Sequence, residues 1–522
     1  MSGGPGSSRL VTGDPSDSRS AELGGGHFQV GGMPWGRRLA HDMVVYGLGG
    51  SAAKVINAFL LPVFVRIMAP GQFGAIDLMT SIASIIMVVG GLGLESALIY
   101  FYARSDDPAE HRRIASTALW TAAAGTAVVS LVALVGKPVL EATVGSSEYS
   151  LAYVLTLVYV PINLSAGIVL DVLRLEFRSR QDAAISFFAT IGTAAFAIAI
   201  VALTGAGAAG YMASQIAVTA LSMVAGGWLV RRSLGARPSV AVLRRLLMYG
   251  LPLAGLGITA WVLAWSDRLF LTGYGYVGDL GYYAAANRIA QLTFLPVLAL
   301  QTAWSPFAIA ASRDPAHRQA FVVVFKAVSF GLLAVVALTS IVAGPVVAFI
   351  LPAAYGASLL PVPLLAGAIA ALGLSGVVAI GLVLTERTGR LAVIGGVTAA
   401  SNILLNIVLI PPLGITGAAA ATLVASIVSL ILVYLAAERV YPIGYPGRRL
   451  IVASGSAGLG IGLLLSASSI DSGIAGGAFG LLPRTVCFLL LTAFAAEVLG
   501  LRPYALRAAS VIASRAWRRR AR

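Results

Sequence analysis

The chain has 522 residues, of which 58% are hydrophobic and only 11% are charged, with a mean hydropathy of +0.89. This excess of apolar residues is more than one soluble core needs, so the composition excludes an ordinary soluble domain and indicates many membrane crossings. The net charge of +15 would also suit a nucleic-acid-binding protein. Because most of the arginines lie in the connections between apolar stretches, we expect no nucleic-acid partner.

The chain begins with a tail, residues 1–40, that is rich in glycine and serine and lacks the apolar core of a signal peptide. We expect this tail to be disordered, cytoplasmic and uncleaved. Apolar windows long enough to span a bilayer follow it. There are fourteen, near residues 43–69, 73–101, 115–136, 149–171, 183–205, 209–230, 247–272, 281–306, 322–346, 358–384, 390–410, 413–437, 450–467 and 477–500. The expected fold is an all-α polytopic membrane protein.

Every second connection between these windows is rich in arginine, whereas the others are short and nearly free of cations, with Lys137 as the clear exception. By the positive-inside rule, both termini are cytoplasmic and the protein lies in the plasma (inner) membrane with an even number of spans. The basic connections contain Arg104, Arg112 and Arg113; Arg174, Arg178 and Arg180; Arg231, Arg232, Arg237, Arg244 and Arg245; Arg313 and Arg318; Arg387 and Arg390; and Arg439, Arg448 and Arg449.

A sequence repeat relates the first window to the seventh. Tyr249-Gly250-Leu251 repeats Tyr46-Gly47-Leu48, and Leu280-Gly281 precedes Ile289 by the interval at which Phe73-Gly74 precedes Ile82. Six spans separate the copies, so the repeats share one orientation and imply a pseudo-twofold axis along the membrane normal. We therefore predict two six-helix lobes, 41–235 and 245–440, followed by helices 13 and 14 within 449–500.

A basic tail, 501–522, ends the chain. The stretch from Tyr504 onward could form a basic helix that anchors to the lipid surface, and a regulatory partner site is the alternative. Cys487 is the only cysteine, so neither an internal disulfide nor a thiolate metal cluster can form, and we expect no cofactor.

Four cations lie within or at the ends of the apolar windows: Lys54, Arg66, Arg268 and Arg288. Such a group normally faces a partner, a wet cavity or an anionic passenger, because it is costly in a bilayer. Lys54 lies near the midplane on one helix face with Ser51 and Asn57, which favours a cavity. Arg66 and Arg268 lie nearer the outer ends of their windows, where reaching the headgroups is the alternative.

Carboxylates in the same windows are candidates for coupling transport to sodium or protons. Asp77, Ser81, Ser84 and Glu95 form one polar stripe if the second window is a single helix. Glu95 would then either pair with Lys54 or act as a coupling group. Asp267 either neutralises Arg268 or couples, although adjacent helix positions point about 100° apart and pair imperfectly.

Aromatic and polar residues accompany the later arginines. Trp261, Trp265, Arg268 and Thr272 share one face of the seventh window, and Arg288, Gln291 and Thr302 share one face of the eighth. Aromatic rings beside a guanidinium suit a sugar phosphate, because a ring packs on the sugar while the guanidinium binds phosphate oxygens. An interfacial anchor is the alternative role for Trp265.

Several short segments give the chain a family resemblance: residues 60–66 (LLPVFVR), 71–74 (GQFG), 250–253 (GLPL), 265–268 (WSDR) and 281–283 (GYY). In these the chain resembles the polysaccharide flippases of the multidrug/oligosaccharidyl-lipid/polysaccharide exporter superfamily. The resemblance implies a transporter, not an enzyme, that moves polyprenyl-pyrophosphate-linked oligosaccharide to the outer leaflet by alternating access. Its partners would be that lipid-linked glycan, membrane lipids and envelope-assembly proteins such as a polysaccharide polymerase.

Three other functions stay open. A flippase for the lipid-linked peptidoglycan precursor belongs to a related branch of the same superfamily. A drug/cation antiporter fits less well, because a cationic drug prefers an acidic pocket and the spans offer more basic than acidic groups. A membrane glycosyltransferase would need clustered carboxylates, and the acids are scattered along the chain.

Overall fold

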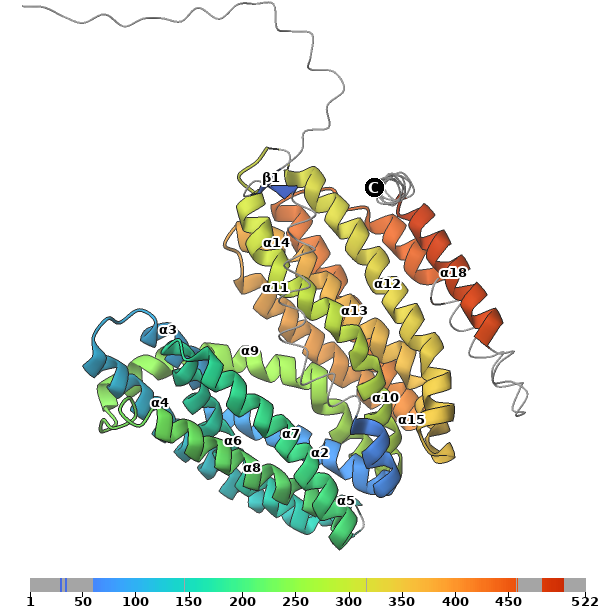
Figure 1. Cartoon of the computed structure of the whole chain (residues 1–522). Coiled ribbons are helices and arrows are strands. Elements are labelled where there is room, and N and C mark those ends of the chain that lie inside the picture. The colour runs from blue at the N-terminus through green and yellow to red at the C-terminus, as the bar shows by residue number, and fades with distance from the viewer. Residues whose placement is uncertain are drawn as a thin grey trace, which may run out of the picture.

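The structure is a computed structural model that describes residues 29–30, 33–34, 60–144, 146–315, 317–456, 458 and 481–501. Almost all of these residues are helical. Figure 1 shows the helices gathered in two bundles, which approach each other where α2 and α10 lie and separate toward α3 on one side and α14 on the other. The expected all-α architecture is confirmed.

The first bundle is built from helical residues 60–67 and seven further helices. Proline occupies the first position of both α2 and α4, where a helix has no use for the missing N–H. Asp107 caps α4 by accepting a hydrogen bond from Ala109 N at 2.8 Å. The helices are α2 (Pro70–Gly91), α3 (Leu94–Tyr102), α4 (Pro108–Leu134), α5 (Lys137–Val144), α6 (Ser150–Leu175), α7 (Ser179–Thr204) and α8 (Gly207–Leu229).

The second bundle begins with α9, which leaves the first bundle and runs across to the second (Figure 1). Its helices are α9 (Val240–Gly273), α10 (Leu280–Ala290), α11 (Phe294–Ala311), α12 (His317–Ile350), α13 (Pro361–Val378), α14 (Ile380–Leu384) and α15 (Gly389–Val440). Short 3-10 turns η1 (Val277–Asp279), η2 (Gln291–Thr293) and η3 (Ala353–Ser358) join some of them. Helical residues 447–456 and α18 (Leu481–Val498) follow, and α18 packs on α12.

Ten helical segments of the described part are long and apolar enough to cross a membrane. The longest, α15, is two helices joined at Gly414, whose φ of 54° and ψ of −131° break the helix just after Pro411 and Pro412. The ten segments therefore contain eleven candidate spans, and each coincides with one of the predicted windows. The windows 43–69, 450–467 and 477–500 lie partly outside the described residues, so the total of fourteen stays a prediction.

Two strands of two residues each, β1 (Gln29–Val30) and β2 (Met33–Pro34), pair antiparallel within the tail that the sequence predicts to be disordered. The predicted lobe boundaries stay predictions, as does the basic tail, which lies outside the described residues from position 502 onward.

The second predicted window is not one helix. Leu92 and Gly93 both adopt left-handed backbone angles, with φ of 53° and 69°, and they separate α2 from α3. Because this turn redirects the chain, Glu95 does not continue the stripe of Asp77, Ser81 and Ser84, and the prediction of one continuous stripe is wrong.

The eighth window contains no comparable break. The chain tightens into the 3-10 turn η2 between α10 and α11 while keeping right-handed helical angles, so Arg288 lies in the last turn of α10, Gln291 in η2 and Thr302 in α11. The suggestion that these three residues share one face stays a prediction.

The two bundles contact each other closely at one end of the molecule, where α2 begins, α9 ends and α10 begins; we call this the Pro70 end. A β-carbon on Gly281 would lie 2.0 Å from Pro70 O, and one on Gly74 would lie 2.5 Å from Gly281 N. Gly74 and Gly281 are equivalent positions in the predicted repeat, as expected for residues that meet near a pseudo-twofold axis. The backbones of α2 and α10 touch here because neither residue has a side chain.

We expect Gly281→Ala to destabilise the protein by about 1–3 kcal/mol, because the added methyl group must push two backbones apart. Gly278→Ala is the matched control, since nothing lies within 4 Å of its hypothetical β-carbon. Thermal unfolding of both variants in detergent, followed by tryptophan fluorescence, measures the difference. Equal Tm values for the two variants would contradict the close contact at the Pro70 end.

Candidate functional site: an ion network between the bundles and a polar cavity

A buried arginine connects the two bundles near the Pro70 end. The Arg268 side chain is only 2% exposed, and its Nε donates to Asp77 Oδ2 at 2.8 Å. Its Nη1 donates to Asp267 Oδ1 at 2.6 Å and to Ala264 O at 2.9 Å. Because Asp77 belongs to α2 and Arg268 to α9, this ion pair joins the first bundle to the second.

The network contains one guanidinium and two carboxylates. Asp77 and Asp267 are both buried, and the Tyr283 hydroxyl of α10 donates to Asp267 Oδ2. The expectation that Asp267 and Arg268 pair imperfectly is wrong, because the long arginine side chain folds back to reach its neighbour. Buried charges are tolerated when they are paired and hydrogen-bonded, and these residues meet both conditions.

Aromatic rings enclose the Arg268 guanidinium. Its Cζ lies 5.0 Å from the ring centroid of Trp265 and 5.0 Å from that of Tyr283. Nη2 is buried, and no described residue accepts a hydrogen bond from it. The ring faces supply part of the attraction that an acceptor would otherwise give. Trp265 thus contacts the buried cation, whereas its alternative role as an interfacial anchor needs no such contact.

Trp261 links α9 to α2 a little farther from the Pro70 end. Its side chain is 9% exposed, and Nε1 donates to Ser84 Oγ at 2.9 Å and to Ser81 O at 3.1 Å. The hydroxyl of Ser81 faces Trp265 O at 3.4 Å. The polar residues of α2 therefore bind α9 in this structure.

A second polar contact, next to the Arg268 network, joins α9 to α15 through residues that were not predicted from the sequence. Ser266 Oγ donates to Asn402 Oδ1 at 3.2 Å, and Asn406 Nδ2 donates to the same oxygen at 3.2 Å. Both asparagines are buried. A signal was present in the sequence, because two asparagines four residues apart in an apolar window share one helix face.

Arg288 of α10 contrasts with Arg268. It is half-buried, and its Cζ lies 4.4 Å from the ring centroid of Phe73. In the part of the chain that the structure describes, Arg288 has neither a carboxylate partner nor a hydrogen bond. A cation held against an aromatic face but without a counter-ion keeps its donors available for an anion.

The other predicted cations are placed differently. Arg66 is exposed within helical residues 60–67, and Gln291 is half-buried in η2. Lys54 and Asn57 lie outside the described residues, so their role in a cavity and the pairing of Lys54 with Glu95 stay predictions.

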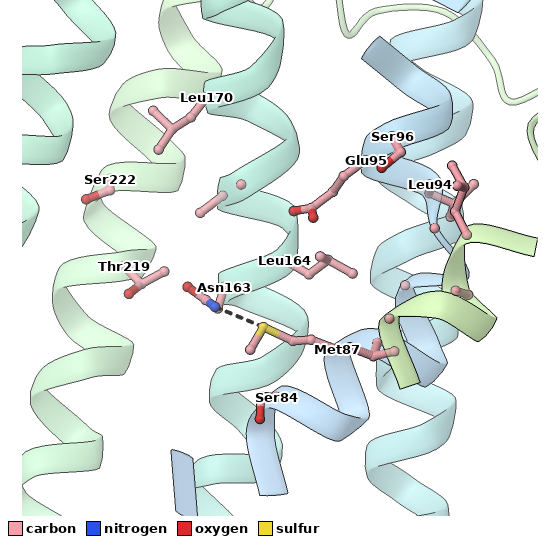
Figure 2. Close-up of a pocket in the computed structure, with 18 of the residues that line it drawn as sticks. Ser84, Met87, Leu94, Glu95, Ser96, Asn163, Leu164, Leu170, Thr219 and Ser222 are labelled. Carbon is pink, nitrogen blue, oxygen red and sulfur yellow. Dashed lines mark hydrogen bonds between the residues drawn. The ribbon is translucent and has the colours of Figure 1, made fainter. Parts of the chain in front are cut away.

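A cavity of about 530 Å³ opens between α9 and the helices of the first bundle. In Figure 2, Glu95 of α3 points toward the side of the cavity where Asn163 of α6 and Thr219 of α8 lie. Asn163 Nδ2 contacts Met87 Sδ at 3.1 Å. Glu95 is the one charged residue among the described lining residues, and within the described chain its carboxylate has no ion pair or hydrogen bond. The polar lining residues are Ser84, Glu95, Ser96, Asn163, Thr219 and Ser222.

We expect Arg268→Ala to destabilise the protein by about 3–5 kcal/mol, because it leaves two buried carboxylates without their cation. Arg66→Ala is the control, since it removes an exposed arginine from the same membrane region. The folded fraction after heating, measured by gel filtration in detergent, compares the variants. An Arg268→Ala protein as stable as Arg66→Ala would show that the network is not structurally important.

Comparison with known proteins shows which family the chain belongs to. Residues 39–310, more than half of the chain, match the model of the family described as "Polysaccharide biosynthesis protein". Over 235 residues the chain is 26% identical to the succinoglycan biosynthesis transport protein ExoT of Rhizobium meliloti (strain 1021). That alignment covers 44% of this chain and 46% of ExoT, so the chain matches less than half the length of this relative.

Solved structures share the fold. The lipid II flippase MurJ in an inward closed conformation superposes with a TM-score of 0.66 at 12% identity, covering 87% of this chain and 98% of MurJ. An inward-facing multidrug resistance transporter of the MATE family gives a TM-score of 0.59 at 17% identity, covering 77% and 98% of the two chains. At such low identities the likeness establishes the fold alone. The chain is a multi-pass membrane protein with the fold of these transporters, and it belongs to the polysaccharide biosynthesis protein family.

Proposed function

We propose that this protein is a flippase that moves a polyprenyl-pyrophosphate-linked oligosaccharide from the cytoplasmic to the outer leaflet. Membership of the polysaccharide biosynthesis family carries this proposal, because the matched residues 39–310 include the ion network, Arg288 and the cavity. The name of the relative ExoT, a succinoglycan transport protein, supports a saccharide cargo. The transporter fold fits movement across the membrane without covalent chemistry.

The cargo combines a polar sugar head, an anionic pyrophosphate and a long apolar tail. The head and the pyrophosphate need a hydrated path with cations, because both are costly to place in hydrocarbon, while the tail stays in lipid. Arg288 is the described cation best suited to meet the pyrophosphate, since no carboxylate among the described residues neutralises it. Arg268 is less available, because Asp77 and Asp267 already bind it. Lys54 remains a second candidate for this role.

The orientation follows from the positive-inside rule. With the arginine-rich connections and both termini in the cytoplasm, the Pro70 end faces the outside of the inner membrane. The ion pair between Asp77 and Arg268 would then close the outer side. Rocking of the bundles would break that contact and open the cavity outward. The excess carboxylate of the network offers a place for coupling, since a proton or sodium ion at Asp77 would weaken its attraction to Arg268.

The released glycan would pass to envelope-assembly proteins such as a polysaccharide polymerase. In this proposal the protein binds and releases the lipid-linked glycan unchanged, with membrane lipids as its other partners. A lipid-linked peptidoglycan precursor is chemically similar, and the assay below therefore includes it as a competing cargo.

We expect Arg288→Ala to slow flipping by about tenfold or more, because a good charge-assisted contact to phosphate is worth about 1.5–3 kcal/mol. Arg288→Lys should keep part of the rate, and Arg66→Ala should be close to the unchanged protein. The measurement uses purified protein in vesicles and follows the appearance of the fluorescently labelled glycan head in the opposite leaflet. The same assay on Lys54→Ala tests the second candidate cation.

Loss of flipping in Arg66→Ala but not in Arg288→Ala would contradict the assignment of Arg288. Absence of flipping of any lipid-linked oligosaccharide by the unchanged protein, with flipping of the peptidoglycan precursor, would replace the proposed cargo. Export of organic cations alone would replace the proposed function.

A further inference from the structure

We propose that the cavity around Glu95 binds a sugar of the transported glycan and selects neutral and amino sugars over acidic ones. The inference rests on the proposed function, since it names the cargo of that same transporter. It concerns the glycan head only and not the pyrophosphate.

The lining of the cavity has the chemistry of a sugar site. Hydroxyl, amide and carboxylate groups from different helices face the space, and these groups donate to and accept from sugar hydroxyls. Leu164, Leu170 and Met87 supply apolar surface on which the C–H face of a sugar ring can pack. Figure 2 shows Asn163 and Leu164 on one helix, with Glu95 reaching toward them from another. The volume of about 530 Å³ lies in the range of pockets that bind ligands of several rings.

The charge of the cavity decides which sugars fit. A carboxylate accepts hydrogen bonds from two adjacent hydroxyls of a neutral sugar or from the ammonium group of an amino sugar. The carboxylate of a uronic acid beside Glu95 would place two like charges together in a partly apolar space, which costs binding energy. Glu95 therefore attracts neutral and amino sugars through hydrogen bonds and repels uronic acids through its negative charge.

No described cation compensates Glu95. Arg174 is the basic residue that acts on it electrostatically. Its guanidinium is already occupied, because Nη1 binds Asp171 Oδ1 at 2.9 Å and Nε binds Asp182 Oδ2 at 3.0 Å. Asp171 also acts on Glu95 electrostatically and opposes the effect of Arg174, so this arginine is not a dedicated counter-ion for Glu95.

A metal-ion site fits these residues poorly. Calcium and magnesium take six or more oxygen ligands at short distances. In the described part of the chain, no group of three or more His, Cys, Asp or Glu side chains could hold a metal ion. Glu95 stands alone in a wide cavity instead, which suits a larger, hydroxyl-bearing ligand.

The experiment compares two polyprenyl-pyrophosphate disaccharides that differ only at C6 of the distal sugar, which is glucose in one and glucuronic acid in the other. In vesicles, the unchanged protein should flip the glucose form about tenfold faster or more, as expected for a repulsive like-charge contact. Glu95→Gln should retain flipping of the glucose form and reduce the ratio of the glucose rate to the glucuronic acid rate to about two- or threefold. Glu141→Gln, in α5 and paired with Lys137 at 3.4 Å, is the control and should keep the original ratio.

A second variant protects the test against a folding defect in Glu95→Gln. Asn163→Asp adds another carboxylate to the cavity, and it should increase the preference for the glucose form. Gel filtration confirms that both variants remain folded.

Three outcomes would overturn the inference. In the first, the unchanged protein flips both disaccharides equally fast. In the second, the ratio of the glucose rate to the glucuronic acid rate is the same in Glu95→Gln and Asn163→Asp. In either case the proposed function stands and the proposed selectivity fails. Flipping of neither disaccharide, with Glu95-dependent transport of an organic cation, overturns the proposed function as well.

Discussion

The pairing of Arg268 with Asp77 and Asp267 is the interaction on which the closed end of the molecule depends. A lone cation at this depth would be costly, and so would either carboxylate, but together they satisfy most of each other's hydrogen bonds in a site that water does not reach. The cluster holds α2 against α9 while Gly74 and Gly281 let α2 meet α10. Two kinds of contact therefore hold this end together. One is the ion pairing of Arg268, which can break and re-form, and the other is the close backbone contact that requires glycine at positions 74 and 281.

Two arginines in neighbouring helices differ in their contacts. Arg268 is bound by two carboxylates, whereas Arg288 lies against Phe73 with no carboxylate partner in the described part of the chain. The cavity near Glu95 lies closer to the N-terminal end of α9 than Arg268 does, and Gly257 of α9 lines it. Under the proposed function and the further inference, anion binding at Arg288 of α10, sugar binding near Glu95 of α3 and closure at Arg268 of α9 occupy separate places. Such a division suits a cargo whose charge and sugars lie in different parts of one molecule.

Composition and apolar windows were enough to predict the helical membrane fold, because a bilayer dictates the length and polarity of each span. They did not reveal the break at Leu92 and Gly93, since a non-glycine residue such as Leu92 rarely adopts left-handed backbone angles. The identity of the charged residues was readable, but their partners were not. Asp77 and Arg268 are 191 positions apart, and only packing decides that they pair while Glu95 has no ion pair among the described residues. The hydrogen bonds of Asn402 and Tyr283 were not predicted, because polar residues without charge are common in membrane helices and do not by themselves indicate a partner.

The central claim is that the bundles separate at the Pro70 end during transport. Spin labels at Val139 of α5 and at Leu360, just before α13, report that separation in a protein whose native Cys487 is replaced by serine. Pulsed electron–electron double resonance on vesicles should show one distance between the two labels without cargo. An additional, longer distance should appear when lipid-linked oligosaccharide is added. The longer distance should already be present in Asp77→Asn without cargo. A single unchanged distance in actively flipping vesicles would contradict the account.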